Sequence, residues 1–197
     1  KPFSMRELVA RLKVLLRHVN NDGYVWSTDW AANVARAELE FRRYIDGTFE
    51  QYAHLVDYVE EPRNEYVDDG SAGRGELESR VMWARACAYV WKTVFQPRWP
   101  HIQALIGNQP VGNNIPLGFF KAAHDYGAGI ATHAYIHFSS PGVRDPHDFR
   151  YHSGRWAFDD DAARAAGYRV PIAITETGPY AGVVDGWKSA KVLSGNE

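Results

Sequence analysis

The sequence predicts an α/β fold in which short parallel strands alternate with longer helices. Short apolar or β-branched runs alternate along the chain with stretches in which apolar residues recur at helical spacing. The later strands begin near positions 55, 102, 130 and 171, about 39 residues apart on average. A barrel of eight βα units in about 250 residues needs about 31 residues per unit before loop insertions. We therefore expect 197 residues to form one domain, 1–197, that is an incomplete (β/α)8 TIM barrel with about strands 3 to 7 present and both ends truncated.

The first half of the chain supplies three predicted elements. An apolar run at 14–16 is the first predicted strand, and it ends at Arg17. A helix is predicted at 30–45, because its apolar residues recur at spacings of three and four and form one stripe. The stripe consists of Trp30, Val34, Ala37, Phe41 and Ile45. A second strand at 55–59 runs into the polar segment 60–65, so several acidic residues follow a strand end.

The middle of the chain continues the same alternation. A helix is predicted at 76–95 after a glycine-rich loop, and Pro97 ends it. The single cysteine, Cys87, lies among apolar residues of this helix, so we expect it in the core and in no internal disulfide. An apolar run at 102–106 predicts the next strand, and a helix follows at 116–126.

The last part of the chain contains one long loop between two predicted strands. The first strand is at 130–138, and about twenty residues rich in Pro, Gly, His and Asp follow it. A helix at 159–166 ends at a glycine. The strand at 171–175 then ends directly at Glu176.

Composition restricts the classes of partner. The formal net charge is −2, with 22 basic and 24 acidic residues interspersed, which is not the pattern of a protein that binds nucleic acid or anionic lipid. No stretch approaches the roughly 18 uncharged apolar residues of a membrane span. A small neutral ligand such as a carbohydrate fits this charge balance, and the seven tryptophans and eleven tyrosines offer faces on which sugar rings stack. The sequence does not indicate where the protein resides.

Two glutamates, Glu65 and Glu176, follow predicted strands. Enzymes built on βα repeats place catalytic groups at the carboxyl ends of their parallel strands. Glycoside hydrolysis with retention needs one carboxyl group that protonates the leaving oxygen and a second, about 5 to 5.5 Å away, that attacks the anomeric carbon. The two positions therefore predict a pair of catalytic carboxylates.

The segment 57–66, DYVEEPRNEY, resembles the strand-four motif of the clan A glycoside hydrolases, in which Asn-Glu ends the strand. In that family the Glu is the acid/base and the Asn before it binds the hydroxyl next to the anomeric carbon. The resemblance implies that Glu65 is the acid/base and Asn64 a substrate-binding residue. A second register remains open, in which Glu61-Pro62 takes the place of the family's Glu-Pro. Only Glu65 follows an Asn, so it is the preferred candidate.

The segment 172–178, IAITETG, resembles the strand-seven motif of the same family, whose Glu is the nucleophile. The resemblance implies that Glu176 has this role. His133 and Tyr135, on the strand before it, correspond to the His or Tyr that orients the nucleophile. Arg17 matches a polar residue at the barrel mouth more weakly.

The expected function is hydrolysis of O-glycosidic bonds in an oligo- or polysaccharide by double displacement, which requires no cofactor. Arg155, after the long loop, is a candidate for substrate binding or for anchoring that loop. An alternative is a catalytically inactive carbohydrate-binding barrel. A second alternative is a metal-dependent hydrolase, because His133 and His137 share one face of a strand and a third ligand could come from His147 or His152.

Overall fold

The fold is an α/β arrangement with one parallel sheet and a layer of helices. A computed structural model describes residues 27–45, 47–62, 74–109, 114–137 and 154–180. The elements follow in the order α2 (Trp30–Tyr44), α3 (Gly47–Tyr52), η1 (Ala53–Leu55), β1 (Tyr58–Glu60), α4 (Arg74–Val90), η2 (Trp91–Phe95), β2 (Gln103–Gln109), α5 (Leu117–Tyr126), β3 (Gly129–His137), α7 (Arg155–Ala165) and β4 (Ile172–Tyr180). A helix separates each pair of successive strands, as the sequence predicts.

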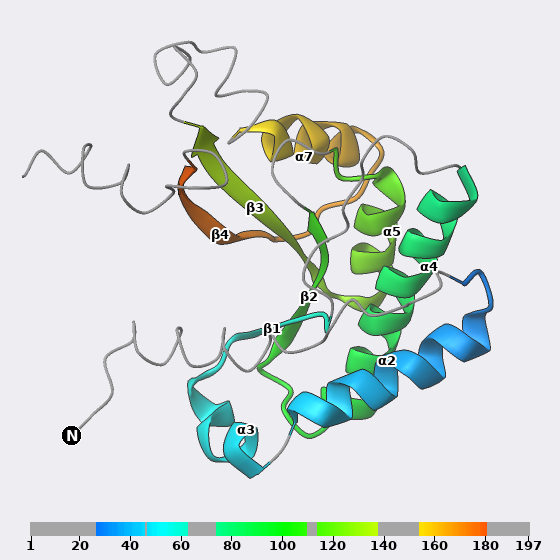
Figure 1. The fold of residues 1–197 in the computed structure, drawn as a ribbon, viewed down its shortest axis with the longest axis vertical. Helices are drawn as coiled ribbons and strands as arrows, with labels where there is room; N and C mark the ends of the chain where they lie inside the picture. The colour runs from blue at the N-terminus through cyan, green and yellow to red at the C-terminus, as the bar shows by residue number, and fades with distance from the viewer. Residues whose placement is uncertain (1–26, 46, 63–73, 110–113, 138–153, 181–197) are drawn as a thin grey trace, which may run out of the picture.

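The four strands form one sheet in the order β1-β2-β3-β4, and all neighbours are parallel. Helices α2, α4, α5 and α7 lie along one side of this sheet (Figure 1). Parallel neighbours require a crossover connection, and the helices supply it. All strands therefore end at the same edge of the sheet, called here the carboxyl edge.

The predicted (β/α)8 barrel is wrong for the described chain. Within the described ranges β1 pairs with β2 alone and β4 with β3 alone, so the sheet is open, with four strands instead of about five. The predicted strand at 14–16 lies outside the described residues. Alternating βα units predict parallel neighbours and a helical layer, but closure depends on strand number, tilt and stagger, which the alternation does not specify.

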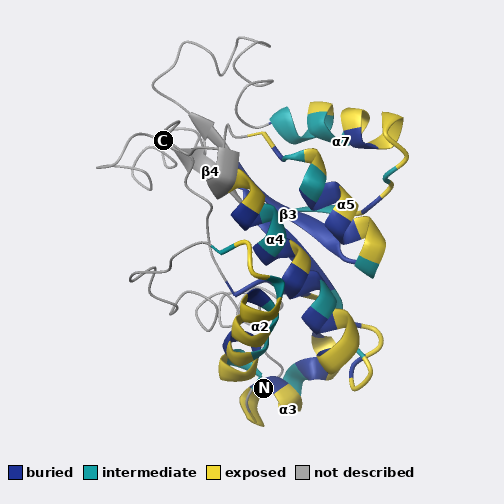
Figure 2. Cartoon of the chain, turned by 90° about the vertical axis from the view of Figure 1, so that its right-hand side faces the viewer, coloured by how far each residue is buried: buried dark blue, intermediate teal, exposed yellow. Residues whose placement is uncertain are grey.

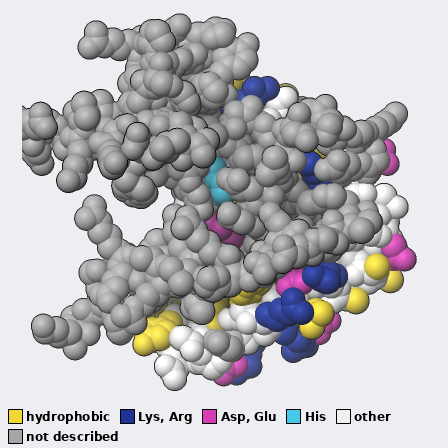
Figure 3. Space-filling model, viewed as in Figure 1, with side chains coloured by type: hydrophobic (Ala, Val, Ile, Leu, Met, Phe, Trp, Pro, Cys, Tyr) yellow, Lys and Arg dark blue, Asp and Glu magenta, His cyan; other side chains and the backbone are white. Residues whose placement is uncertain are grey.

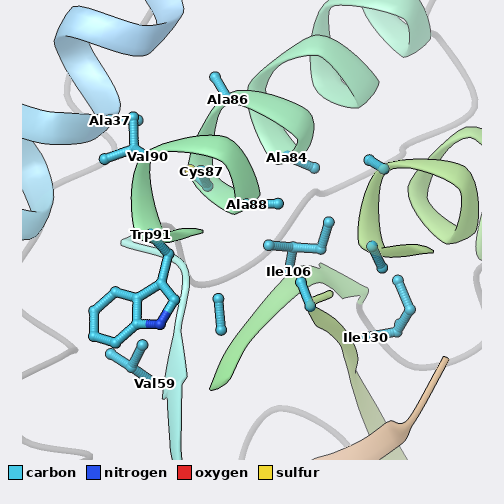
Figure 4. Packing of buried hydrophobic residues seen from close by; sticks show 14 of the residues in the cluster. Ala37, Val59, Ala84, Ala86, Cys87, Ala88, Val90, Trp91, Ile106 and Ile130 are labelled. Carbon is cyan, nitrogen blue, oxygen red and sulfur yellow. The ribbon is translucent and has the colours of Figure 1, made fainter. Parts of the chain in front are cut away.

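The core lies between the sheet and α4. Ile106 of β2 points toward the small residues of α4, among them Ala84 and Ala88, whereas Ile130 of β3 lies on the side of the sheet covered by α5 (Figure 4). Small side chains on this helix let it approach the strands closely and keep the packing dense. Cys87 is fully buried in this layer, which confirms its predicted place in the core.

A second contact layer joins α2 to α4. Ala37 of α2 faces Val90 at the end of α4 (Figure 4). Trp91 continues from α4 toward Val59 of β1, and its indole Nε1 donates a hydrogen bond to the Ile102 carbonyl at 3.0 Å. This buried bond connects the helical layer to the start of β2. The outer faces of α2 and α7 are exposed, whereas the side of α4 facing the strands is buried (Figure 2).

The ends of the helices follow local signals in the sequence. Asp29 caps α2, because its side chain accepts a hydrogen bond from the Ala32 N–H at 3.1 Å. Gly127 ends α5 with φ at 68°, a left-handed conformation that glycine adopts at little cost. The predicted helix at 159–166 begins four residues earlier, at Arg155. Helix α3 was not predicted, because it is short and buries only Phe49.

Candidate active site at the carboxyl edge of the sheet

Buried polar side chains gather where the strands end. Five of the nine buried polar or charged residues in the described part of the chain lie at or just after the carboxyl ends of β1, β2 and within β3. These five residues, the carboxyl-end cluster, are Glu61, Asn108, Gln109, Thr132 and His133. Burying polar groups costs free energy unless they are hydrogen-bonded, so such a concentration at one edge needs a specific explanation. At the carboxyl ends of parallel strands, the common explanation is a ligand site.

A bulge at the end of β2 shapes the middle of the cluster. Ile106 pairs with Ile130, but the next paired residues are Gln109 and Thr132, so the register shifts between them. Gly107 lies inside the shift with φ at 94°, a conformation that residues with a Cβ rarely adopt. Asn108 and Gln109 follow this glycine and are both buried, as are the residues of β2 from Ala104 onward.

A second register shift lies between β3 and β4. Thr132 pairs with Ile174, and the next pair is His133 with Glu176, so β4 advances by two residues while β3 advances by one. The extra residue, Thr175, moves the backbone of Glu176 beside that of His133. His133 is buried and belongs to the carboxyl-end cluster. The predicted orienting residue and the predicted nucleophile therefore occupy neighbouring positions on adjacent strands.

Tyr135, the other predicted orienting residue, also lies on β3. Its backbone pairs with Gly178, two residues beyond Glu176 on β4. It is therefore farther along the carboxyl end of the strand than His133. Its predicted role stays a prediction.

Glu61 is the acidic member of the cluster and comes directly after β1. Its backbone N–H donates to the Leu105 carbonyl of β2 at 2.8 Å, and its own carbonyl accepts from Asn108 Nδ2 at 3.4 Å. The hydroxyl of Tyr44 on α2 donates to the carbonyl of the following residue, Pro62, at 3.1 Å. The segment after β1 is therefore held on one side by β2 and on the other by α2, and Glu61 is only 2% exposed.

Three predicted site residues, Glu65, Asn64 and Arg17, lie outside the described residues. Their roles stay predictions. Glu61, which the alternative register proposed as acid/base, is the glutamate of this segment that the structure places at the carboxyl edge and buries.

Arg155, the remaining predicted substrate residue, anchors the start of α7. Its Nε donates to the side-chain oxygen of Asn114 at 2.6 Å, and Asp159 accepts from the Ile115 N–H at 2.9 Å. Both contacts connect α7 to the segment before α5. Burial raises the pKa of Asp159 from its ordinary value, although the hydrogen bond from Ile115 and the charge of Arg155 oppose this effect. The long loop that Arg155 was predicted to anchor lies outside the described residues, so substrate binding and loop anchoring both stay predictions for Arg155.

Comparison with known proteins leaves the chain without a family assignment. It matches no protein-family model, no curated protein sequence and no solved structure. The interpretation of the carboxyl-end cluster therefore rests on the residues of this chain. The resemblance to clan A glycoside hydrolases, whose specificity rests on two short motifs, stays a prediction.

Sequence reasoning did not single out Asn108, Gln109 or Thr132. The first two were assigned to a loop, because the apolar run of the predicted strand ends at Ile106 and a glycine follows. The strand instead continues through the bulge to Gln109. A signal was present, since two adjacent amides directly after a buried parallel strand occupy the position where ligand-binding residues collect.

The alternative of a metal site involves His133, which is described, and His137, whose backbone lies on β3. His147 and His152 lie outside the described residues. Within the described part of the chain, no three His, Cys, Asp or Glu side chains converge as metal ligands. Figure 3 shows a histidine and an acidic side chain close together in the middle of one face, apart from the mixed charges at the lower right.

None of the described helices has the length and apolar character needed to cross a membrane.

Proposed function

We propose that this protein is a retaining glycoside hydrolase in which Glu176 attacks the anomeric carbon and a glutamate directly after β1 protonates the leaving oxygen. The observation that carries the proposal is that buried Glu61 directly follows the end of β1, while Glu176, within β4 of the same parallel sheet, pairs with buried His133. Two carboxylic acids at a shared site are the chemical requirement of this reaction.

The other members of the carboxyl-end cluster fit a sugar ligand. Asn108, Gln109 and Thr132 are neutral, and each can donate and accept hydrogen bonds. Hydroxyl groups of a sugar also donate and accept, so such side chains can bind it without adding charge. In the reaction, Glu176 forms a bond to the anomeric carbon as the leaving group departs with a proton from the acid. The acid/base glutamate, now a carboxylate, then takes a proton from water. The water oxygen attacks the anomeric carbon, the bond to Glu176 breaks, and the sugar is released with retained configuration.

Two glutamates compete for the acid/base role, Glu61 and Glu65. The structure supports Glu61, because it is buried and its backbone is fixed to β2. The sequence supports Glu65, because an Asn precedes it. A kinetic experiment separates the two.

The experiment compares aryl glycosides that differ only in the leaving group. The chain is assayed with phenyl and 2,4-dinitrophenyl β-glycosides of glucose, xylose, mannose and galactose. Dinitrophenolate leaves without protonation, so the acid/base variant still forms the glycosyl-enzyme from the dinitrophenyl glycoside. Its kcat/KM for the phenyl glycoside should fall by about 100-fold or more. Added azide restores turnover in that variant by giving a glycosyl azide. Glu176→Gln should lose activity on both glycosides.

Glu61→Gln and Glu65→Gln are tested side by side, and the variant with the selective loss identifies the acid/base. Glu38→Gln is the matched control, because Glu38 is on the outer part of α2 and pairs only at the surface with Arg42. Binding of the sugars without turnover by the folded wild-type chain would favour the carbohydrate-binding alternative. Loss of turnover on chelation, with recovery on adding Zn²⁺, would favour the metal-dependent alternative.

A further inference from the structure

Asn108 connects the end of β2 to the backbone of Glu61. Its Nδ2 donates to the Glu61 carbonyl at 3.4 Å, and the Glu61 N–H donates to the Leu105 carbonyl at 2.8 Å. Both polar groups of the Glu61 backbone therefore bond to β2. Strand β1 itself ends one residue earlier, at Glu60, so these two bonds extend its attachment beyond the strand.

The residue that donates this bond lies inside the β2 bulge. Gly107, with φ at 94°, lies immediately before Asn108, inside the register shift between Ile106 and Gln109. Asn108 is 1% exposed, so water does not compete strongly for its amide. A residue within the irregular part of β2 thus donates a side-chain hydrogen bond to the residue after the neighbouring strand.

We propose that Asn108 is a positioning residue that fixes Glu61 as the acid/base. The inference rests on the proposed glycosidase function, and it selects Glu61 over Glu65. Proton donation to a leaving oxygen requires hydrogen-bond reach, and a displacement of about 1 Å in a catalytic group costs on the order of 100-fold in rate. A three-residue strand gives Glu61 little support of its own, so the amide of Asn108 supplies it.

The test is the leaving-group dependence of an Asn108 variant. Asn108→Asp keeps the size of the side chain and replaces the donating amide with an oxygen that repels the Glu61 carbonyl. We expect kcat/KM for the phenyl glycoside to fall by about 30-fold, and that for the 2,4-dinitrophenyl glycoside by less than about 3-fold. A residue that only stabilised the fold would lower both values together. An equal loss on the two substrates would overturn the proposal.

Asn33→Asp is the matched control. Asn33 is an equally buried asparagine on α2, and its Nδ2 also donates to backbone carbonyls, those of Ser27 and Asp29. This variant lowers stability without changing the ratio of the two substrates. If Asn108→Asp does not fold, Asn108→Ser replaces it. Its hydroxyl can still donate a hydrogen bond, so we expect a smaller loss of kcat/KM that is still confined to the phenyl glycoside. If Asn33→Asp lowered kcat/KM for the phenyl glycoside alone, as expected for Asn108→Asp, this result would also count against the proposal.

A double-mutant cycle tests whether Asn108 acts through Glu61. In the Glu61→Gln background the Asn108→Asp change should have less than about a 3-fold effect on the phenyl glycoside, because the residue that it positions no longer donates a proton. A full 30-fold effect in that background would show that Asn108 acts elsewhere. Failure of the function proposal is distinguishable, since it appears in the wild-type chain as the absence of hydrolysis of every glycoside.

Discussion

His133 on β3 pairs with Glu176 on β4, and the register shift just before this pair is what makes them neighbours. Without the shift, His133 would pair with Thr175, because Thr132 pairs with Ile174. A slip by one residue in a strand turns the side chains to the opposite face of the sheet. The relationship between the predicted nucleophile and the buried histidine therefore depends on one extra residue in β4.

The first prediction concerns His133. If it orients the nucleophile, His133→Ala should lower kcat/KM by about 10- to 100-fold for phenyl and dinitrophenyl glycosides alike, because both reactions need the attack by Glu176. This pattern differs from the selective loss expected for Asn108. His133→Asn, which keeps a hydrogen-bonding group, should recover part of the rate. Wild-type kinetics in a folded His133→Ala chain would refute the assigned role.

The second prediction concerns the bulge in β2. Gly107→Ala forces a residue with a Cβ into φ near 94°, which costs about 1–3 kcal/mol in unfolding free energy. The new methyl group would meet the Phe119 ring at 3.7 Å, an ordinary contact, so the cost comes from the backbone. Gly47→Ala is the control, because open space surrounds its Cβ position. The free energy of unfolding in urea should fall for Gly107→Ala and change little for Gly47→Ala. Equal free energies for the two variants would mean that position 107 accepts a Cβ without strain.

The third prediction is a pH dependence of stability through Asp159. Its pKa is raised above the ordinary 3.8, chiefly by burial, so the folded chain holds the proton to higher pH than the unfolded chain. The resulting stabilisation is fully present below the ordinary pKa and is lost as pH rises through the folded pKa. Wild type should therefore lose unfolding free energy relative to Asp159→Asn as pH rises from below 3.8 through the folded pKa. Urea unfolding of both chains across this range tests the sign, and a difference that is constant with pH would contradict it.

The fourth prediction concerns the contact between the helical layer and β2. Trp91→Phe keeps an aromatic ring but removes the indole N–H that donates to the buried Ile102 carbonyl. The loss of a buried hydrogen bond and of ring volume should lower the unfolding free energy by about 1–3 kcal/mol. Chemical denaturation measures this directly. A change below about 0.5 kcal/mol would show that Gln96, whose amide also reaches that carbonyl, is sufficient.

Much of the secondary structure could be predicted, because apolar stripes and Gly or Pro stops are local signals. The helix predicted at 30–45 is α2, and the strands predicted at 102–106 and 130–138 correspond to β2 and β3. The strand predicted at 171–175 is only the first part of β4, which continues through Glu176 to Tyr180. Barrel closure could not be predicted, because it depends on how many strands pair and how they tilt. The sequence pattern contains neither quantity.

The site was only partly predictable for a related reason. Glu176 was identified from its place after a predicted strand, and His133 from the family resemblance, and the structure makes their backbone positions neighbours. Asn108 was not identified, because the predicted strand ended at Ile106, whereas β2 continues through a register shift against β3 to Gln109. Register shifts arise from contacts between strands distant in sequence, and a single strand's pattern does not report them.

The measurement closest to the central claim is covalent labelling of the nucleophile. The chain is incubated with 2,4-dinitrophenyl 2-deoxy-2-fluoro-β-glycosides of glucose, xylose, mannose and galactose, and the intact mass and its peptide map are recorded. The fluorine slows release of the glycosyl-enzyme, so a retaining enzyme accumulates it. We expect one sugar to add to Glu176 and to leave Glu176→Gln unlabelled. No adduct with any of the four sugars, or an adduct on another residue, would contradict the assignment of Glu176 as the nucleophile of a retaining glycosidase.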